Sequence, residues 1–312
     1  MCNGTRKEND HASYAAVCIH PGERSCDTGA APVNDAAQRE KPQLHIKPRK
    51  GLQLVDFHEL GHYADLLYFL VARNIKVKYK QTVLGGLWAL IQPLLMMAVF
   101  TLFFGRLAKI PSDGIPYPIF SYSAMIAWVY FAQAINQSGN SIIGEGNLIS
   151  KVYFPRLFIP VTPVLSGLID FSLAFVVLLL MMAFFGIYPA PTALLLPLLV
   201  LLMVMAACGA GFLLAALNAK FRDIQHIIPF LTQVWMFASP IVYPTSMVPE
   251  KFRLVYALNP LVGVIEGFRA SLLRTGPFPT VMVLMSLCVS LAMFVVGLVY
   301  FKQVEHRFAD VI

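Results

Sequence analysis

Long apolar stretches separated by short polar segments are the dominant pattern along this chain. Between Arg156 and Lys220 the only Asp, Glu, Lys, Arg or His side chain is Asp170. A membrane-spanning helix needs about 20 mainly apolar residues, so this run has room for two crossings. Residues 188–191, Tyr-Pro-Ala-Pro, interrupt the run and predict a tight turn in its middle. The pattern therefore predicts a protein embedded in a lipid bilayer.

Six apolar segments have the length of a transmembrane helix. We expect these spans at about residues 84–105, 117–139, 159–187, 192–217, 226–243 and 279–301. The second span is unusually polar toward its end, with Gln133, Asn136, Gln137 and Asn140. Prolines such as Pro93 and Pro229 are tolerated in membrane helices where neighbouring groups satisfy the freed carbonyls. The predicted fold class is an all-α integral membrane protein with a six-span transmembrane domain over residues 82–312.

A helical stripe precedes the first span. Residues 57–81 place apolar side chains at helical spacing and then add a basic cluster of Arg73, Lys76, Lys78 and Lys80. This pattern predicts an amphipathic helix at the membrane interface, with its bases near lipid headgroups. Two interpretations stay open for this helix: a simple anchor beside the membrane, or a docking surface for a partner.

The segment between the last two spans, residues 244–278, has a helical pattern of its own. Leu261, Ile265, Phe268 and Leu272 share one helical face, and Asn259-Pro260 would begin this helix. We expect two short helices that enter the outer leaflet and return, because irregular backbone at that depth must be shielded by protein or water. The alternative is a solvated external hairpin.

Residues 1–50 show no apolar periodicity and are rich in polar residues, which predicts a disordered cytoplasmic tail. The tail has no apolar core after a basic start, so it does not read as a secretory signal peptide.

The composition agrees with a membrane protein: 57% of the residues are hydrophobic, 13% are charged and the mean hydropathy is +0.66. The formal net charge of +7 does not indicate nucleic-acid binding, because membrane proteins collect Lys and Arg in their cytoplasmic loops. More of these bases lie on the side that carries both termini, so we expect both termini in the cytoplasm.

Motifs for catalysis are nearly absent. No GxxxxGK[ST] occurs, so the chain has no P-loop for ATP. His58, Glu59 and His62 match the letters of a zinc-protease helix, but a zinc enzyme would need a third ligand. We expect an accidental match and a protein that is not itself an enzyme; a membrane-embedded metalloenzyme is the alternative from this motif.

Five loop patterns occur in a fixed order between the spans. They are residues 83–88 with 92–94, Lys151–Arg156, Phe221–Ile224, Ser239–Pro244, and Leu258–Leu261 followed by Glu266–Arg269. With these motifs, residues 57–312 resemble the membrane permeases of polysaccharide-exporting ABC transporters, the family that moves O-antigen, capsule or teichoic acid.

The resemblance implies a bacterial inner-membrane permease that works as a homodimer with two copies of a separate ATPase. ATP and Mg would be bound by that ATPase, with no cofactor in this chain. The implied substrate is a lipid-linked polysaccharide, most closely O-antigen, and the surroundings are membrane lipid rather than nucleic acid. Alternatives are an ABC permease for a drug or small lipid, and an ion-coupled secondary transporter in which Asp170 carries protons.

A permease without a nucleotide site must receive force through cytoplasmic contacts. Charged residues of the 57–81 helix and of the two loops at 145–157 and 220–226 are therefore candidates for docking the ATPase. They are Arg73, Glu145, Lys151, Arg156, Arg222 and Asp223. Aromatic rings can stack on sugar faces, which makes six aromatics of the first, second and fifth spans candidates for the translocation path. They are Trp88, Phe100, Tyr122, Trp128, Trp235 and Phe237.

Asp170 lies well inside the third span. A charge in the bilayer is costly, so we expect Asp170 either to face the bundle interior or to be neutral, and to hydrogen-bond a neighbouring helix. A role in proton coupling is the functional alternative.

Overall fold

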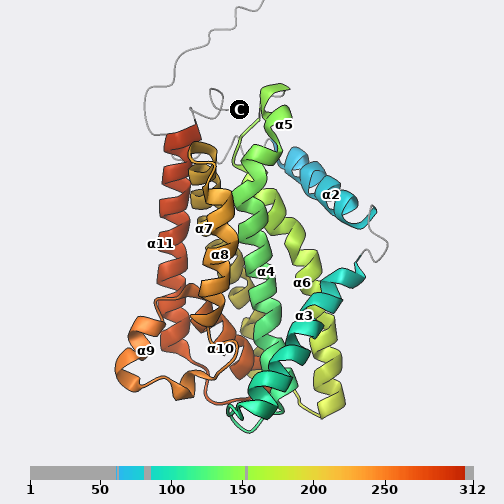
Figure 1. Ribbon diagram of the computed structural model, residues 1–312, viewed down its shortest axis with the longest axis vertical. Coiled ribbons are helices and arrows are strands. Elements are labelled where there is room, and N and C mark those ends of the chain that lie inside the picture. The colour runs from blue at the N-terminus through green and yellow to red at the C-terminus, as the bar shows by residue number, and fades with distance from the viewer. Residues whose placement is uncertain (1–60, 62, 81–85, 152–153, 306–312) are drawn as a thin grey trace, which may run out of the picture. The chain divides into compact units, whose positions relative to one another are not determined.

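The computed structural model describes residues 61, 63–80, 86–151 and 154–305. The predicted tail over residues 1–50, together with His58, Glu59 and His62, lies outside these residues. Throughout the described part, all regular secondary structure is helical, as the sequence predicted (Figure 1).

Five helices are long and apolar enough to cross a membrane. Their elements are α3 (Leu87–Phe100) continued by the π-helical η1 (Thr101–Leu107), α4 (Tyr117–Gly144), α6 (Phe158–Phe185), η2 (Pro191–Leu195) continued by α7 (Leu196–Lys220), and α11 (Thr280–Val304). Each covers most of one predicted span, with ends that differ by up to three residues where the prediction extends beyond the helix. Gly186 ends α6 in the left-handed conformation at φ 67°, which glycine adopts without steric cost.

The remaining helices are shorter. They are α2 (Ala64–Lys80), α5 (Gly146–Lys151), α8 (Ile224–Phe237), η3 (Thr245–Met247), α9 (Glu250–Tyr256) and α10 (Pro260–Leu273). Helix α2 falls inside the predicted 57–81 range.

The predicted fifth span is not one full-length helix. Helix α8 has 14 residues, and at a rise of 1.5 Å per residue it is only about 21 Å long. The chain then leaves the helix at Ala238, where the side chain of Asn259 donates hydrogen bonds to the Ala238 carbonyl (3.0 Å) and to Ser239 Oγ (2.9 Å). Residues 238–244 continue as turns, so the apolar segment at 226–243 combines a short helix with irregular backbone.

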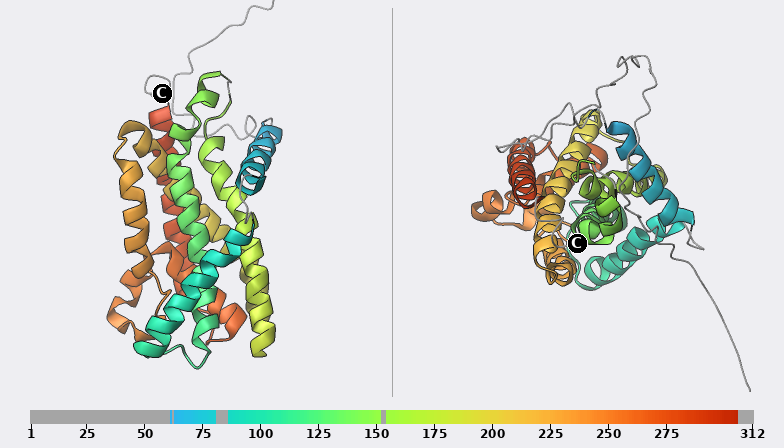
Figure 2. Two further views of the ribbon diagram at one scale, coloured as in Figure 1. Left: turned by 45° about the vertical axis from the view of Figure 1, so that its right-hand side comes forward. Right: turned by 90° about the horizontal axis from the view of Figure 1, so that it is seen from above.

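Helix α4 forms the centre of the bundle. It packs against α6 and α7, while α7 makes the most extensive helix pair with α11. Two views show α4 surrounded by the other long helices, with α2 lying across the outside near the start of α6 (Figures 1 and 2). Between Ile119 and Phe131, every α4 side chain except Val129 is buried.

The segment before the last span folds back against the bundle rather than standing free in solvent. Leu261, Ile265 and Phe268 of α10 are fully buried, and α10 packs against α11, α7 and α4. Asn259 caps α10 by accepting a hydrogen bond from the Leu261 amide at 3.1 Å. Helix α10 is therefore shielded by protein, whereas α9 has no buried residue. Helix α9 lies at the opposite end of the long helices from α5 (Figure 1).

Candidate functional site

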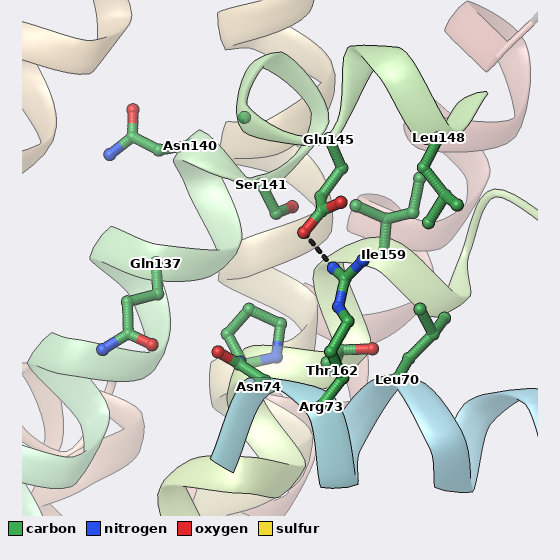
Figure 3. Close-up of a pocket in the computed structure, with 12 residues that line it drawn as sticks. Leu70, Arg73, Asn74, Gln137, Asn140, Ser141, Glu145, Leu148, Ile159 and Thr162 are labelled. Carbon is green, nitrogen blue, oxygen red and sulfur yellow. Dashed lines mark hydrogen bonds and ion pairs between the residues drawn. The ribbon is translucent and has the colours of Figure 1, made fainter. Parts of the chain in front are cut away.

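A pocket of about 290 Å³ opens between α2, α4, α5 and α6. Its walls combine amide, hydroxyl and charged groups with a few aliphatic side chains (Figure 3). The lining residues are Leu70, Arg73, Asn74, Gln137, Asn140, Ser141, Gly144, Glu145, Leu148, Ile159, Thr162 and Pro163. Arg73 and Glu145 were docking candidates, and Gln137 and Asn140 belonged to the polar end of the second predicted span. The docking of α2 adds Leu70, Arg73 and Asn74 to the pocket.

Arg73 and Glu145 form an ion pair with each other across this pocket (Figure 3). Arg73 comes from α2, and Glu145 directly follows the end of α4. Both were candidates for docking an ATPase. Their side chains remain 47% and 36% exposed, so the pair lies at the surface and a partner can still reach it.

A second polar cluster attaches the end of α2 to α6. Asp170 accepts a hydrogen bond from the Tyr79 hydroxyl and pairs with the Lys78 ammonium, while Asn74 Nδ2 donates to Ser166 Oγ at 3.1 Å. Burial, followed by the hydrogen bond to Asp170 and its charge, raises the pKa of Tyr79, so the phenol keeps its proton. Helix α2 therefore holds the Asp170 side chain through Lys78 and Tyr79.

The other docking candidates lie apart from the pocket. Arg156 Nη1 donates to the Glu305 carbonyl at 2.5 Å, and Glu305 also pairs with Lys302 at 2.8 Å, so Arg156 fixes the end of α11. Lys151 is exposed at the end of α5. Arg222 and Asp223 are exposed in the turn between α7 and α8.

The aromatic path candidates divide into two groups in this single chain. Phe100, Tyr122 and Trp128 are at most 7% exposed, and Tyr122 donates a hydrogen bond to the Ala174 carbonyl at 3.1 Å. These three rings pack the interior and reach no surface. Trp88 and Phe237 are more than half exposed, at 56% and 54%.

Trp235 lies between these extremes. Its indole Nε1 donates to Asn259 Oδ1 at 3.0 Å, and its ring meets that of Phe131 edge-on with centroids 5.1 Å apart. The side chain is half-buried and joins α8 to α4 and to the start of α10.

Amide side chains link α4 to three of its neighbours. Gln133 Nε2 donates to Gln92 Oε1 of α3 at 3.0 Å, and Asn136 Nδ2 lies 3.4 Å from Thr232 Oγ1 of α8. Asn218 of α7 donates to Asn140 Oδ1 at 3.0 Å. The unusually polar end of this span was visible in the sequence, whereas its partners were not.

The sequence placed Arg269 of α10 in the Glu266–Arg269 motif but did not predict its burial. Arg269 is fully buried and pairs with Glu266 at 3.0 Å. Its guanidinium stacks 3.6 Å from the centre of the Phe120 ring and donates to the Ile241 carbonyl at 3.2 Å. Arg269 therefore ties α10 to α4 and to the turns after α8, which is a packing role for a residue that looked like a loop charge.

The described residues contain no cluster that matches a catalytic metal site. Among them, no group of three or more His, Cys, Asp or Glu side chains is placed to hold a metal ion. The site consists of hydrogen-bonding and charged groups around an apolar bundle, which can bind and guide a polar molecule. The fold and site thus define a polytopic membrane protein with a polar surface beside one of its central helices.

Comparison with known proteins gives the family. Residues 65–273 match the family of ABC-2 type transporters, and this chain belongs to that family. It is 32% identical over 215 residues to the O-antigen export system permease protein RfbA of Myxococcus xanthus, covering 68% of this chain and 82% of the relative. It is 28% identical over 256 residues to the RfbA protein of Klebsiella pneumoniae, covering 82% and 98%. The polysialic acid transport protein KpsM of Escherichia coli is 24% identical over 205 residues, covering 65% and 80%.

Proposed function

We propose that this chain is the permease subunit of an ATP-driven exporter that moves a lipid-linked polysaccharide, most closely O-antigen, across the bacterial inner membrane. The observation that carries the proposal is the alignment with an O-antigen export permease over 98% of that relative's length. Relatives named for polysialic acid and capsule export support the same substrate class.

The proposed transporter contains two copies of this chain and two copies of a separate ATPase that binds ATP and Mg. This chain lacks a P-loop, so force must enter through contacts with the ATPase. The exposed Lys151, Arg222 and Asp223 and the surface pair Arg73–Glu145 are the proposed contacts. Both termini and these contacts would lie in the cytoplasm.

Two other transport functions are less well supported. A permease for a drug or small lipid would share the family, but the relatives described above are named for polysaccharides. An ion-coupled transporter would need Asp170 to exchange protons, whereas this carboxylate is held by Lys78 and Tyr79.

Deleting the gene for this chain in its host and returning it on a plasmid tests the proposal. We expect the deletion to remove surface polysaccharide and to leave lipid-linked polysaccharide on the cytoplasmic side, with recovery on complementation. Purified alone, the chain should hydrolyse no ATP, and affinity purification from cells should retain an ATPase. Unchanged surface polysaccharide in the deletion strain, or ATP turnover by the pure chain, would contradict the proposal.

A further inference from the structure

The open face of α4 differs from that of every other long helix in the described part of the chain. Most exposed side chains of α3, α6 and α11 are apolar, as expected for helices that face lipid. Leu95, Val99, Leu173, Val176, Leu180, Leu284 and Leu291 are examples. By contrast, α4 is buried over most of its length, and the side chains it leaves open toward its end are mostly polar, with Ile143 an apolar exception.

These polar residues share one side of the helix. Gln133, Asn136, Gln137 and Asn140 follow the spacing i, i+3, i+4, i+7, which places them on one helical face. Gln137 is exposed, and its amide makes no hydrogen bond to another described residue. The other three amides are partly open. Gln133 is held by Gln92, while Asn136 and Asn140 each donate to the backbone carbonyl four residues earlier and also meet Thr232 and Asn218.

Lipid is an unsuitable neighbour for such a face. Polar side chains in membrane spans face the bundle interior or a water-filled path, because hydrocarbon offers them no hydrogen bonds. The face also continues without interruption into the polar pocket, since Gln137 and Asn140 line both (Figure 3). The pocket adds Asn74, Ser141 and Thr162, so the polar surface continues from α4 onto α2 and α6.

The charge and the hydrogen-bonding groups of this polar surface indicate which class of ligand it can bind. The face of α4 carries no formal charge, and the two charges of the adjoining pocket, Arg73 and Glu145, pair with each other, so the surface does not favour a polyanion or a metal ion. Amides donate and accept hydrogen bonds at once, which matches hydroxyl groups that do the same. We propose that the amide face of α4, with the adjoining pocket, is a binding track for the neutral sugar units of the exported polysaccharide.

This inference rests on the proposed function, and it adds the residues that would touch the sugar chain. Gln137 contributes a free amide to passing hydroxyls. Gln133, Asn136 and Asn140 contribute amides whose orientation is fixed by neighbouring helices. Several weak hydrogen bonds along one face allow a long polymer to slide, because no single contact must be broken at high cost.

Cysteine labelling in the assembled transporter tests the track directly. Gln137→Cys and, as a control on the lipid-facing side of α6, Leu180→Cys are treated with a charged thiol reagent in membrane vesicles, and labelling is read by peptide mass spectrometry. We expect labelling at 137 and none at 180. Loading purified lipid-linked polysaccharide in the absence of ATP should slow labelling at 137 several-fold.

Export measurements complete the test. Gln137→Leu should lower polysaccharide export roughly fivefold, the loss expected for about one hydrogen bond, at unchanged complex yield. Gln137→Asn keeps an amide and should retain most of the export. The Leu180→Ala variant should behave as the wild type.

The outcomes separate the two proposals. Wild-type export together with full export by Gln137→Leu, or labelling at 137 that polysaccharide does not slow, would overturn the track alone. A disulfide between two copies of Gln137→Cys, with no effect of polysaccharide, would assign the face to a contact between subunits and overturn the track. A wild-type transporter that moves no polysaccharide would remove the proposed function as well.

Discussion

Gly209 and Gly297 bring the backbones of α7 and α11 into direct contact. A Cβ atom added to Gly297 would overlap the Gly209 carbonyl oxygen, and one added to Gly209 would lie 2.6 Å from the Met293 carbonyl carbon. Small residues at such a crossing allow close packing of membrane helices, whose association gains little from the hydrophobic effect in lipid. This crossing lies within the most extensive helix pair of the bundle.

We expect Gly297→Ala to lower the free energy of unfolding by about 1–3 kcal/mol, the usual cost of overpacking. Thermal unfolding of the purified chain in detergent measures the change. Gly276→Ala is the control, because a Cβ there meets no atom within 4 Å and the change should be close to neutral. Equal stability of the two variants would show that α7 and α11 can separate without cost.

Because Asp170 attaches α2 to α6, we expect its substitutions to lower the stability of the protein by different amounts. Asp170→Leu loses both the ion pair to Lys78 and the hydrogen bond from Tyr79. We expect a loss of about 1–2 kcal/mol in stability, between the values for exposed and buried pairs. Asp170→Asn can still accept from Tyr79 and should lose less.

The same variants separate this structural role from proton coupling. If Asp170 carried protons, Asp170→Asn would abolish export while leaving thermal stability unchanged. Export by vesicles with and without a proton gradient, measured beside the melting temperature, decides between the two roles.

The Arg73–Glu145 pair predicts rescue by charge reversal. Arg73→Glu or Glu145→Arg alone brings like charges together and should weaken ATP-driven export, although an exposed pair contributes only about 0.2–1 kcal/mol to stability. The double reversal restores the attraction between the two side chains and should restore thermal stability, but it presents reversed charges to the ATPase, so export should stay low. Full export by the double variant would contradict the proposed contact with the ATPase.

Trp235 was expected from the sequence to line the path, so that Trp235→Ala would lower export without harming assembly. Its hydrogen bond to Asn259 and its contact with Phe131 favour the competing interpretation. We expect Trp235→Ala to lower thermal stability and complex yield in step with export. Trp235→Phe keeps the ring and should lose less; export loss at full complex yield would return Trp235 to the path.

The orientation predicted from Lys and Arg can be tested at two ends of the bundle. Ser246, which is exposed and donates to Asp113 at 3.0 Å, lies near α9, whereas Lys151 ends α5 at the opposite end (Figure 1). An impermeant reagent applied from outside should label Ser246→Cys and not Lys151→Cys. The reverse result would place α5 and the proposed docking residues outside the cytoplasm.

The sequence predicted the long helices well because their ends are marked by polar residues, prolines and glycines. Gly186 and Pro191, for example, delimit the turn between α6 and α7. The early end of α8 was missed, although Pro240 disfavours a helix at the residue before it. The hydrogen bond from Asn259 to the Ala238 carbonyl could not be predicted, because the two residues are more than 20 positions apart. A local pattern contains no information on such a contact.

The candidate site was predicted in residue type more than in pairing. Arg73 and Glu145 were both recognised as charges available for contact, but 72 positions separate them and only the docking of α2 joins them. The sequence also could not show which of the aromatic path candidates are buried. Spans that are apolar on all sides give no sign of which face meets protein, so Tyr122 and Trp128 looked equivalent to Trp88.

The polar face occupies only the part of α4 near α5. From Ile119 to Phe131 the helix is closed over by its neighbours, and Arg269 fills the space beside Phe120. A sugar chain arriving from the α5 end meets hydrogen-bonding partners at once, whereas one arriving from the α9 end meets none on α4. On the proposed track, a sugar chain would therefore be captured faster from the α5 end, which would favour loading at that end and release at the other.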